Sequence, residues 1–358
     1  MSSFKKFFTN RKIIITGHTG FKGSWLTLWC VILGAKVTGI SNGITSNPSH
    51  YKSLNLKKKI KDINLDIRNL KKLKQIFKKT QPDYIFHLAA QSLVKKSYVN
   101  PVETFTSNTI GTLNLLEALR SVNKRCHAVI ITSDKSYKNL EIKKGYKEND
   151  LLGGDDPYSG SKGAAELIIN SYFKSIISKR KNISITISRA GNVIGGGDWS
   201  ADRIIPDCVR SWSKNKKAII RNPHSTRPWQ HVLEVIRGYL QSAILGKKNY
   251  RALNGEAFNF GPNNNQNKSV IQLVKLMKKN WSSVNWKVKK NNKNKESKLL
   301  KLNSTKAKKI LNWKPLLSFN EGVKLTADWY KMFYSRDYKT FELSKNQILN
   351  YENKIKKK

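Results

Sequence analysis

Short apolar runs alternate with amphipathic stretches along the first half of the chain. Continuous apolar segments, which are typical of buried strands, cover residues 12–16, 35–41, 82–90, 127–134 and 183–192. Between them, apolar residues recur at helical spacing over residues 24–33, 69–80, 109–122 and 160–177. Strands that alternate with helices predict a parallel sheet covered on both faces. We therefore predict an α/β fold whose ligands bind at the carboxyl ends of the strands.

The first predicted strand runs directly into a glycine-rich turn, GHTGFKG, at residues 17–23. Glycines at such a turn allow the backbone to approach a pyrophosphate closely. The helix that follows offers free N–H groups and the positive end of its dipole. A tight turn without a ligand is the alternative, but the position between a strand and a helix favours a dinucleotide cofactor.

Composition narrows the class of protein. The chain has 358 residues and a net charge of +45, with lysines spread along its whole length. Such a charge fits a nucleic-acid binder, but its even spread favours a solvated basic surface. The three cysteines, an odd number without CxxC spacing, predict reduced thiols rather than disulfides or a zinc site. No apolar run is long enough to span a bilayer, so we expect a cytoplasmic protein without a membrane partner.

Further motifs carry a resemblance to a known family. HLAA at 87–90, NTIGT at 108–112 and Tyr158-x-x-x-Lys162 follow the glycine turn in the order typical of the extended short-chain dehydrogenase/reductase family. The resemblance implies a Rossmann-like doubly wound parallel sheet with a smaller C-terminal substrate domain. The NAD-binding domain would cover 1–192, with about 229–262 returning to it. The substrate domain would cover 193–228 and 263–340, and 341–358 would form a loose charged tail.

Longer motifs resemble the nucleotide-sugar 4,6-dehydratases of that family, and among these the dehydratases of CDP-glucose. They are TSDKSY, GGDDPYSGSKGAAE, SRAGNVIGGGDW and RNPHSTRPWQHVLE, and the resemblance extends from about Lys12 to residue 330. It implies a lyase that oxidises the sugar at C4, eliminates water across C5 and C6, and returns hydride to C6 with internally recycled NAD. It also implies a nucleotide-sugar substrate, no nucleic acid, no metal, and a homodimer formed through segments 105–121 and 160–177.

The resemblance also implies roles for five catalytic residues. Tyr158 would take the proton of the C4 hydroxyl, with its pKa lowered by Lys162 one helical turn away. Ser133 would hydrogen-bond the C4 oxygen, and Asp134 would protonate the departing C6 hydroxyl. Lys135 stands where related dehydratases have a glutamate base, so we expect either that it removes the C5 proton or that its charge only stabilises the enolate.

Binding residues carry over from the same family motifs. We expect the cofactor to contact Gly17, Thr19, Gly20, Phe21, Lys22, Gly23, Asp66, Ile67, Leu88, Ala89, Ala90, Asn108, Tyr158 and Lys162. We expect the substrate to contact Gln91, Asn192, Arg203, Arg227 and His231. The usual acid after the second strand is missing, and Ser41 or Asn42 would take its place at the ribose. The alternatives are a dehydratase or epimerase for another nucleotide sugar and a catalytically silent NAD-binding protein.

Overall fold

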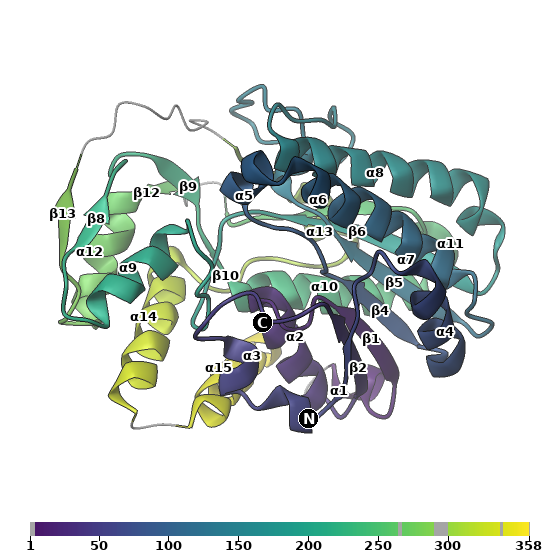
Figure 1. Cartoon of the computed structure of the whole chain (residues 1–358), viewed down its shortest axis with the longest axis horizontal. Coiled ribbons are helices and arrows are strands. Elements are labelled where there is room, and N and C mark those ends of the chain that lie inside the picture. Colours follow the sequence, from purple (N-terminus) through teal and green to yellow (C-terminus); the bar gives the residue numbers. More distant parts are fainter. Residues whose placement is uncertain (1–3, 264–266, 290–299, 337–338, 358) are drawn as a thin grey trace.

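Seven strands form one parallel sheet in the order β11-β6-β5-β4-β1-β2-β3 (Figure 1). The computed structural model describes residues 4–263, 267–289, 300–336 and 339–357. The strands are β1 (Lys12–Thr16), β2 (Lys36–Ser41), β3 (Lys61–Asn64), β4 (Tyr84–His87), β5 (Cys126–Ile131), β6 (Ile183–Ala190) and β11 (Ala257–Phe260). The chain reverses its direction of winding between β1 and β4, where ligands bind in sheets of this kind. The predicted α/β, Rossmann-like fold is therefore confirmed.

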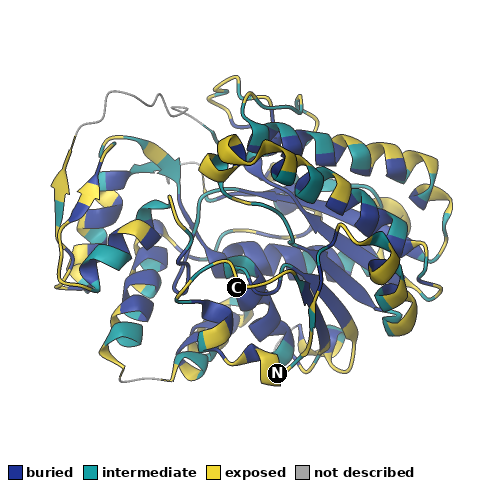
Figure 2. Ribbon diagram, viewed as in Figure 1, coloured by how far each residue is buried: buried dark blue, intermediate teal, exposed yellow. Residues whose placement is uncertain are grey.

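Helices cover both faces of this sheet, which is why β4, β5 and β6 are buried along their whole length (Figure 2). Along β1, Ile14 packs in one apolar core, whereas Ile13 and Ile15 pack in the other. The helices of the Ile14 core are α4 (Leu70–Thr80), α7 (Gly111–Leu119) and α8 (Pro157–Ser175). The opposite core contains α2 (Phe21–Ile32) and α10 (Val232–Lys248).

A second group of elements lies to one side of the sheet (Figure 1). Its helices are α9 (Ile204–Trp212), α12 (Val270–Asn280) and α14 (Phe319–Ser335). Its strand pairs are β8 (Ala218–Ile220) with β13 (Trp286–Val288) and β9 (Thr226–Pro228) with β12 (Asn267–Ser269), and β7 (Val193–Ile194) pairs with β10 (Gln230–His231) nearer the sheet. The division into an NAD-binding and a substrate domain stays a prediction. Residues 264–266, 290–299 and 337–338 of the predicted substrate domain lie outside the described residues.

Short elements complete the described chain. The helices are α1 (Lys5–Phe8), α3 (His50–Ser53), α5 (Val94–Val99), α6 (Pro101–Phe105), α11 (Tyr250–Leu253) and α13 (Thr305–Ile310). The 3₁₀ turns are η1 (Leu56–Lys58), η3 (Asp134–Ser136) and η4 (Ile177–Lys179), and η2 (Thr106–Ile110) is π-helical. The three cysteines are free and buried. Among the described helices, none combines the length and the apolarity needed to cross a bilayer.

The prediction of a loose charged tail over 341–358 is wrong for the described residues. Residues Thr340–Lys356 form helix α15, which packs against α2 and α14. Leu343, Ile348 and Tyr351 are buried in the main apolar core, and Trp29 Nε1 of α2 donates a hydrogen bond of 2.7 Å to Glu352 Oε1. The apolar residues of this segment share one helical face. Because lysines are interspersed among them, the helical spacing was not recognised in the sequence.

Candidate active site

The glycine turn joins β1 to α2 through two close backbone contacts. A Cβ at Gly23 would lie 2.1 Å from the Gly17 carbonyl oxygen, and one at Gly17 would lie 2.6 Å from the Ala89 nitrogen. Gly17 also has a φ of +72°, which side chains disfavour. Gly17 is therefore required where the turn packs against the loop after β4, and Gly23 is required where α2 packs against the turn itself, whatever binds there. Leu88 and Ala90 belong to the same loop.

Gly20 is different, because no packing requires it. A Cβ there would meet only the Gly17 carbonyl oxygen, at 3.4 Å, an ordinary contact. Gly20 is the N-cap of α2, with no side-chain cap and no acidic residue in the first turn. The first N–H groups of a helix have no acceptor within the helix. The turn therefore has the space and the donors that a dinucleotide pyrophosphate needs, and Phe21 and Lys22 open this helix.

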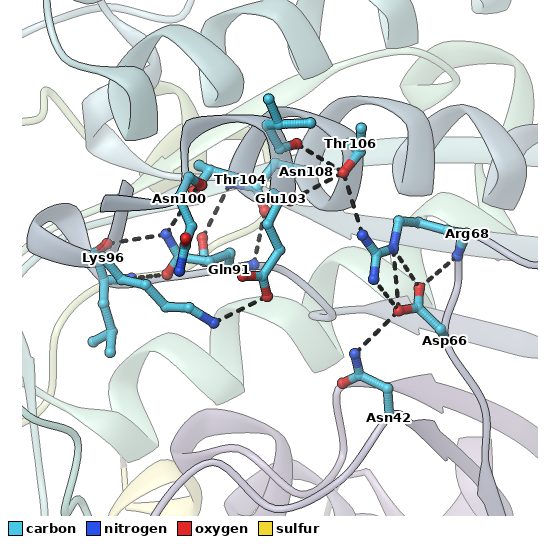
Figure 3. Close-up of polar contacts among 12 residues, drawn as sticks. Asn42, Asp66, Arg68, Gln91, Lys96, Asn100, Glu103, Thr104, Thr106 and Asn108 are labelled. Carbon is cyan, nitrogen blue, oxygen red and sulfur yellow. Dashed lines mark hydrogen bonds and ion pairs between the residues drawn. The ribbon is translucent and has the colours of Figure 1, made fainter. Parts of the chain in front are cut away.

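Polar side chains also gather where β2 and β3 end, at the expected adenosine end of the site (Figure 3). Asn42 Nδ2 donates 3.2 Å to Asp66 Oδ2, and Arg68 binds both oxygens of the same carboxylate. This pairing with Arg68 lowers the pKa of Asp66. Ile67 is buried, and a Cβ at Gly111 would lie 2.4 Å from its Cδ1. The Asn42 amide is therefore bonded to Asp66, and a contact of Ser41 or Asn42 with the ribose stays a prediction.

Two residues of the glycine turn are committed to the protein itself. Thr19 Oγ1 lies 2.7 Å from Ser41 Oγ and 2.6 Å from the Gly43 carbonyl oxygen. His18 is fully buried, and its Nε2 lies 2.9 Å from Asp62 Oδ1 on β3. These bonds fix the glycine turn to the ends of β2 and β3. The Thr19 hydroxyl therefore already has two partners in the protein. A contact of this side chain with the cofactor stays a prediction.

Tyr158 and Lys162 lie one turn apart near the start of α8, and both side chains are buried. Asp156 caps this helix by accepting a hydrogen bond from the Ser159 nitrogen, and Pro157 occupies its first position. Burial raises the pKa of Tyr158, and a hydrogen bond with Ser133 and the charge of Arg203 oppose that rise. Lys162 was expected to lower this pKa, but in the protein without cofactor burial outweighs the neighbouring charges.

The surroundings of Lys162 disfavour its charged form. Burial first, and repulsion from Lys22 second, lower the pKa of Lys162 to about 8. Burial, with repulsion from Arg203, likewise lowers the pKa of Lys22 to about 8, whereas the charges of Asp134 and Asp198 oppose this change. Lys22 thus lies in the electrostatic field of the residues at the reaction centre. We predicted that it contacts the cofactor pyrophosphate, and its position near the N-terminus of α2 allows that contact.

The end of β5 brings the remaining catalytic candidates to the same place. Ser133 lies two residues beyond the end of β5, and Asp134 begins the turn η3. Ser133 Oγ donates to Asp134 Oδ1 at 3.0 Å and accepts from the Lys135 nitrogen at 3.2 Å. A Cβ at Gly191 would lie 1.9 Å from Asp134 Oδ2, so a glycine is needed for this carboxylate to fit. Asp134 and Ser133 both act on the pKa of Tyr158, which places the three side chains together.

Asn108 and Gln91 brace the loop after β4 rather than presenting free amides (Figure 3). Asn108 Nδ2 donates to Ser161 Oγ at 2.9 Å and to the Gln91 carbonyl at 3.0 Å, and its Oδ1 accepts from the Gln91 nitrogen. Gln91 Nε2 donates to the Leu93 carbonyl and to Thr104 Oγ1, each at 3.0 Å. Because these amide hydrogens have protein partners, we infer that both residues position the loop between α8 and the glycine turn.

The predicted substrate residues come from several elements. Arg203 Nη1 binds Asp198 Oδ2 at 3.0 Å, and its charge acts on Tyr158, so it lies at the reaction centre. Asn192 accepts a hydrogen bond from the Gln230 nitrogen, and Arg227 lies on β9 farther along the chain. His231 is 2 % exposed and packs against Trp25, and burial lowers its pKa to about 3. The structure therefore gives His231 a core position.

The chain matches known proteins over most of its length. The family model described as GDP-mannose 4,6 dehydratase matches residues 14–326. CDP-glucose 4,6-dehydratase from Salmonella typhimurium is 40% identical, over 97% of this chain and 98% of its own. CDP-paratose 2-epimerase from Salmonella typhi is 26% identical, over 89% of this chain and 98% of its own.

Solved structures share the fold. UDP-glucuronic acid 4-epimerase from Bacillus cereus, in complex with UDP-glucuronic acid and NAD, has a TM-score of 0.75 and 25% identity, covering 90% of this chain and 100% of its own. A dTDP-glucose 4,6-dehydratase from Streptomyces venezuelae with NAD bound has a TM-score of 0.76 and 20% identity, covering 91% of this chain and 98% of its own. The second likeness is one of fold alone.

Proposed function

Because this chain belongs to the GDP-mannose 4,6-dehydratase family, within the extended short-chain dehydrogenases/reductases, we propose that it converts CDP-D-glucose into CDP-4-dehydro-6-deoxy-D-glucose and water. The observation that carries the chemistry is the cluster at the ends of β5 and α8. There Tyr158, Lys162, Ser133 and Asp134 lie together and buried. An epimerase has no need of the acid at position 134, so this cluster favours dehydration.

NAD is the proposed cofactor, and when bound it supplies both the oxidation at C4 and the later reduction at C6. Gly17, Gly20 and Gly23 with the N-terminus of α2 would hold its pyrophosphate, and Asp66 with Asn42 would lie at its adenosine. Tyr158, as phenolate, would accept the proton of the C4 hydroxyl, with Ser133 donating a hydrogen bond to the same oxygen. The Lys162 ammonium would stabilise this phenolate.

Elimination of water requires an acid at C6 and a base at C5. Asp134 would protonate the leaving C6 hydroxyl, because its buried carboxylate lies near Tyr158 and against Gly191. Lys135, in the same turn, is the proposed base for the C5 proton. A Lys135→Gln variant that still exchanges solvent hydrogen into C5 at the normal rate would rule out the base role.

The proposed partners are small molecules and a second copy of the chain. Arg203 would contact the substrate near Tyr158, on which its charge acts. Arg227 would contact the diphosphate, since a guanidinium pairs with diphosphate oxygens bidentately. A homodimer through segments 105–121 and 160–177, and a cytoplasmic location, stay predictions. Sedimentation of the purified protein tests the dimer.

The experiment that tests the function is a comparison of nucleotide sugars. The purified protein and NAD are incubated separately with CDP-glucose, dTDP-glucose, GDP-mannose and UDP-glucose, and the alkaline absorbance of 4-keto-6-deoxysugars is followed. Product from CDP-glucose alone supports the proposal. Product from another nucleotide keeps the chemistry and overturns the substrate. NAD binding without any product overturns the proposed activity and favours a silent binding protein.

A further inference from the structure

A third buried residue follows Tyr158 and Lys162 on the same face of α8. Glu166 lies one turn beyond Lys162, since residues four apart on a helix are stacked along one side. Its side chain is 3 % exposed. No step of the proposed reaction uses this carboxylate, although its charge favours the ammonium form of Lys162. A buried carboxylate is costly unless it is paired and hydrogen-bonded, so its partners indicate what it does.

The partners of Glu166 flank the catalytic turn on both sides. Thr132 Oγ1 donates a hydrogen bond of 2.6 Å to Glu166 Oε1. Ser136 Oγ lies 3.1 Å from the same oxygen and 2.7 Å from the Ser133 carbonyl oxygen, so it shares its proton between them. Thr132 precedes Ser133, and Ser136 ends the 3₁₀ turn that begins at Asp134. One oxygen of Glu166 therefore holds both ends of the segment that carries the acid and the base.

Glu166 is itself fixed from a third element. Arg189 on β6 donates from Nε to Glu166 Oε1 at 2.7 Å and from Nη2 to Oε2 at 2.5 Å. The Arg189 side chain is also buried, and its Nη1 bonds Tyr137 Oη and the Glu148 carbonyl. A bidentate pair of this kind fixes the orientation of the carboxylate. Stability alone would require only the ion pair with Arg189, whereas the hydrogen bonds to Thr132 and Ser136 tie the catalytic turn to it.

We propose that Glu166 is a positioning residue that locks the Ser133–Asp134–Lys135 turn against the helix carrying Tyr158 and Lys162. The oxidation pair lies on α8 and the elimination pair lies after β5, so the reaction requires a fixed distance between two separate elements. Glu166 sets that distance through Thr132 and Ser136. The effect of Glu166 on turnover rests on the proposed function. The coupling of the catalytic turn to α8 through Glu166 does not.

The test removes the two hydroxyls and leaves the ion pair intact. The double variant Thr132→Val/Ser136→Ala keeps Glu166 and Arg189 paired, so a buried charge is not exposed. We expect a loss of kcat of about 10- to 100-fold, the range that follows from a small misplacement of catalytic groups, with KM within about threefold of wild type. Reduced nicotinamide should accumulate during turnover, because oxidation at C4 proceeds and elimination lags. The single variant Thr132→Ser, which keeps a hydroxyl at this position, should keep most of the wild-type activity.

Thr326→Val is the matched control. Thr326 is equally buried and donates 2.8 Å to the Gly322 carbonyl within α14, far from the catalytic turn in the chain. We expect this variant to keep the wild-type kcat. A double variant with the same kcat and the same nicotinamide signal as the control overturns the positioning role.

A readout without substrate separates this proposal from the proposed function. Amide hydrogen exchange over residues 133–137 should be faster in the double variant than in wild type, because the turn loses its anchor to α8. Unchanged exchange overturns the coupling, whatever the enzyme does. If wild type dehydrates no nucleotide sugar but the exchange still accelerates, the proposed function fails and the coupling stands.

Discussion

Replacing Lys162 with methionine should stabilise the protein without cofactor while removing its activity. Lys162 is 6 % exposed, and burial with repulsion from Lys22 lowers its pKa from 10.5 to about 8. A change of that size corresponds to about 3 kcal/mol of unfavourable free energy in the charged form. Methionine fills a similar space without a charge, so most of this cost disappears. The free energy of unfolding at pH 7 should rise by up to about 3 kcal/mol.

The effect has a definite dependence on pH. The folded-state pKa of Lys162 lies below its unfolded value, so between about pH 8 and 10.5 the unfolded chain holds more protons than the folded one. The wild type therefore bears the full penalty below pH 8 and loses it as the pH rises to 10.5. The difference in stability between Lys162→Met and wild type should be largest at pH 7 and should vanish near the upper end of this range.

The assay is denaturation of both proteins, freed of cofactor, at several pH values. With an unfolding entropy of about 2.1 cal/mol/K per residue, 3 kcal/mol raises the midpoint temperature of this chain by about 4 °C. Lys306→Met is the control, because the Lys306 side chain is 27% exposed and its ammonium pairs with Glu256. The control should gain no stability. A Lys162→Met protein that is destabilised at pH 7, or whose stability difference from wild type does not change with pH, would show that the buried Lys162 charge is not unfavourable.

Three further predictions concern the site and the last helix. Tyr158→Phe should lower kcat about 10²- to 10⁴-fold with an unchanged Tm, as steady-state kinetics and a thermal scan would show, because only a proton acceptor is lost; a smaller loss would contradict its role. Gly20→Ala should fold normally but bind NAD at least about tenfold more weakly by calorimetry, because its methyl fills the space of the pyrophosphate. Gly23→Ala, with a Cβ 2.1 Å from the Gly17 oxygen, should be strongly destabilised. Equal stability of the two variants would contradict this prediction. Tyr351→Phe should lower the unfolding free energy by about 1.5–3 kcal/mol in urea, because its hydroxyl bonds Glu234 and Arg237 in the core; an unchanged midpoint would mean that α15 is not docked in solution.

The parts of the fold that the sequence predicts are those with local signals. Buried strands are continuous apolar runs, so the sheet and the glycine turn between β1 and α2 were predictable from spacing alone. Tyr158 and Lys162 were predictable because family motifs name them. Helix α15 was missed because its apolar face binds α2, at the other end of the sequence, and the lysines around that face resemble those of a solvated tail.

The remaining site features depend on contacts between distant segments. Nothing near His18 in the sequence indicates that Asp62 holds it in the core. Glu166 carries one weak signal, its spacing of four from Lys162, but its tie to the catalytic turn depends on Thr132 from another element. The net rise in the pKa of Tyr158 was not predicted, since spacing along a helix reports neighbouring charges but not the cost of burial.

In the proposed reaction one site oxidises C4, eliminates water and reduces C6 without exchanging the transferred hydrogen with solvent. CDP-glucose labelled with deuterium at C4 is the substrate for the decisive test, with the product analysed by NMR. We expect the deuterium at C6 of the product, and we expect product formed from unlabelled substrate in heavy water to carry deuterium at C5. Product with the label lost to solvent, or substrate recovered with its label and no product, would contradict it.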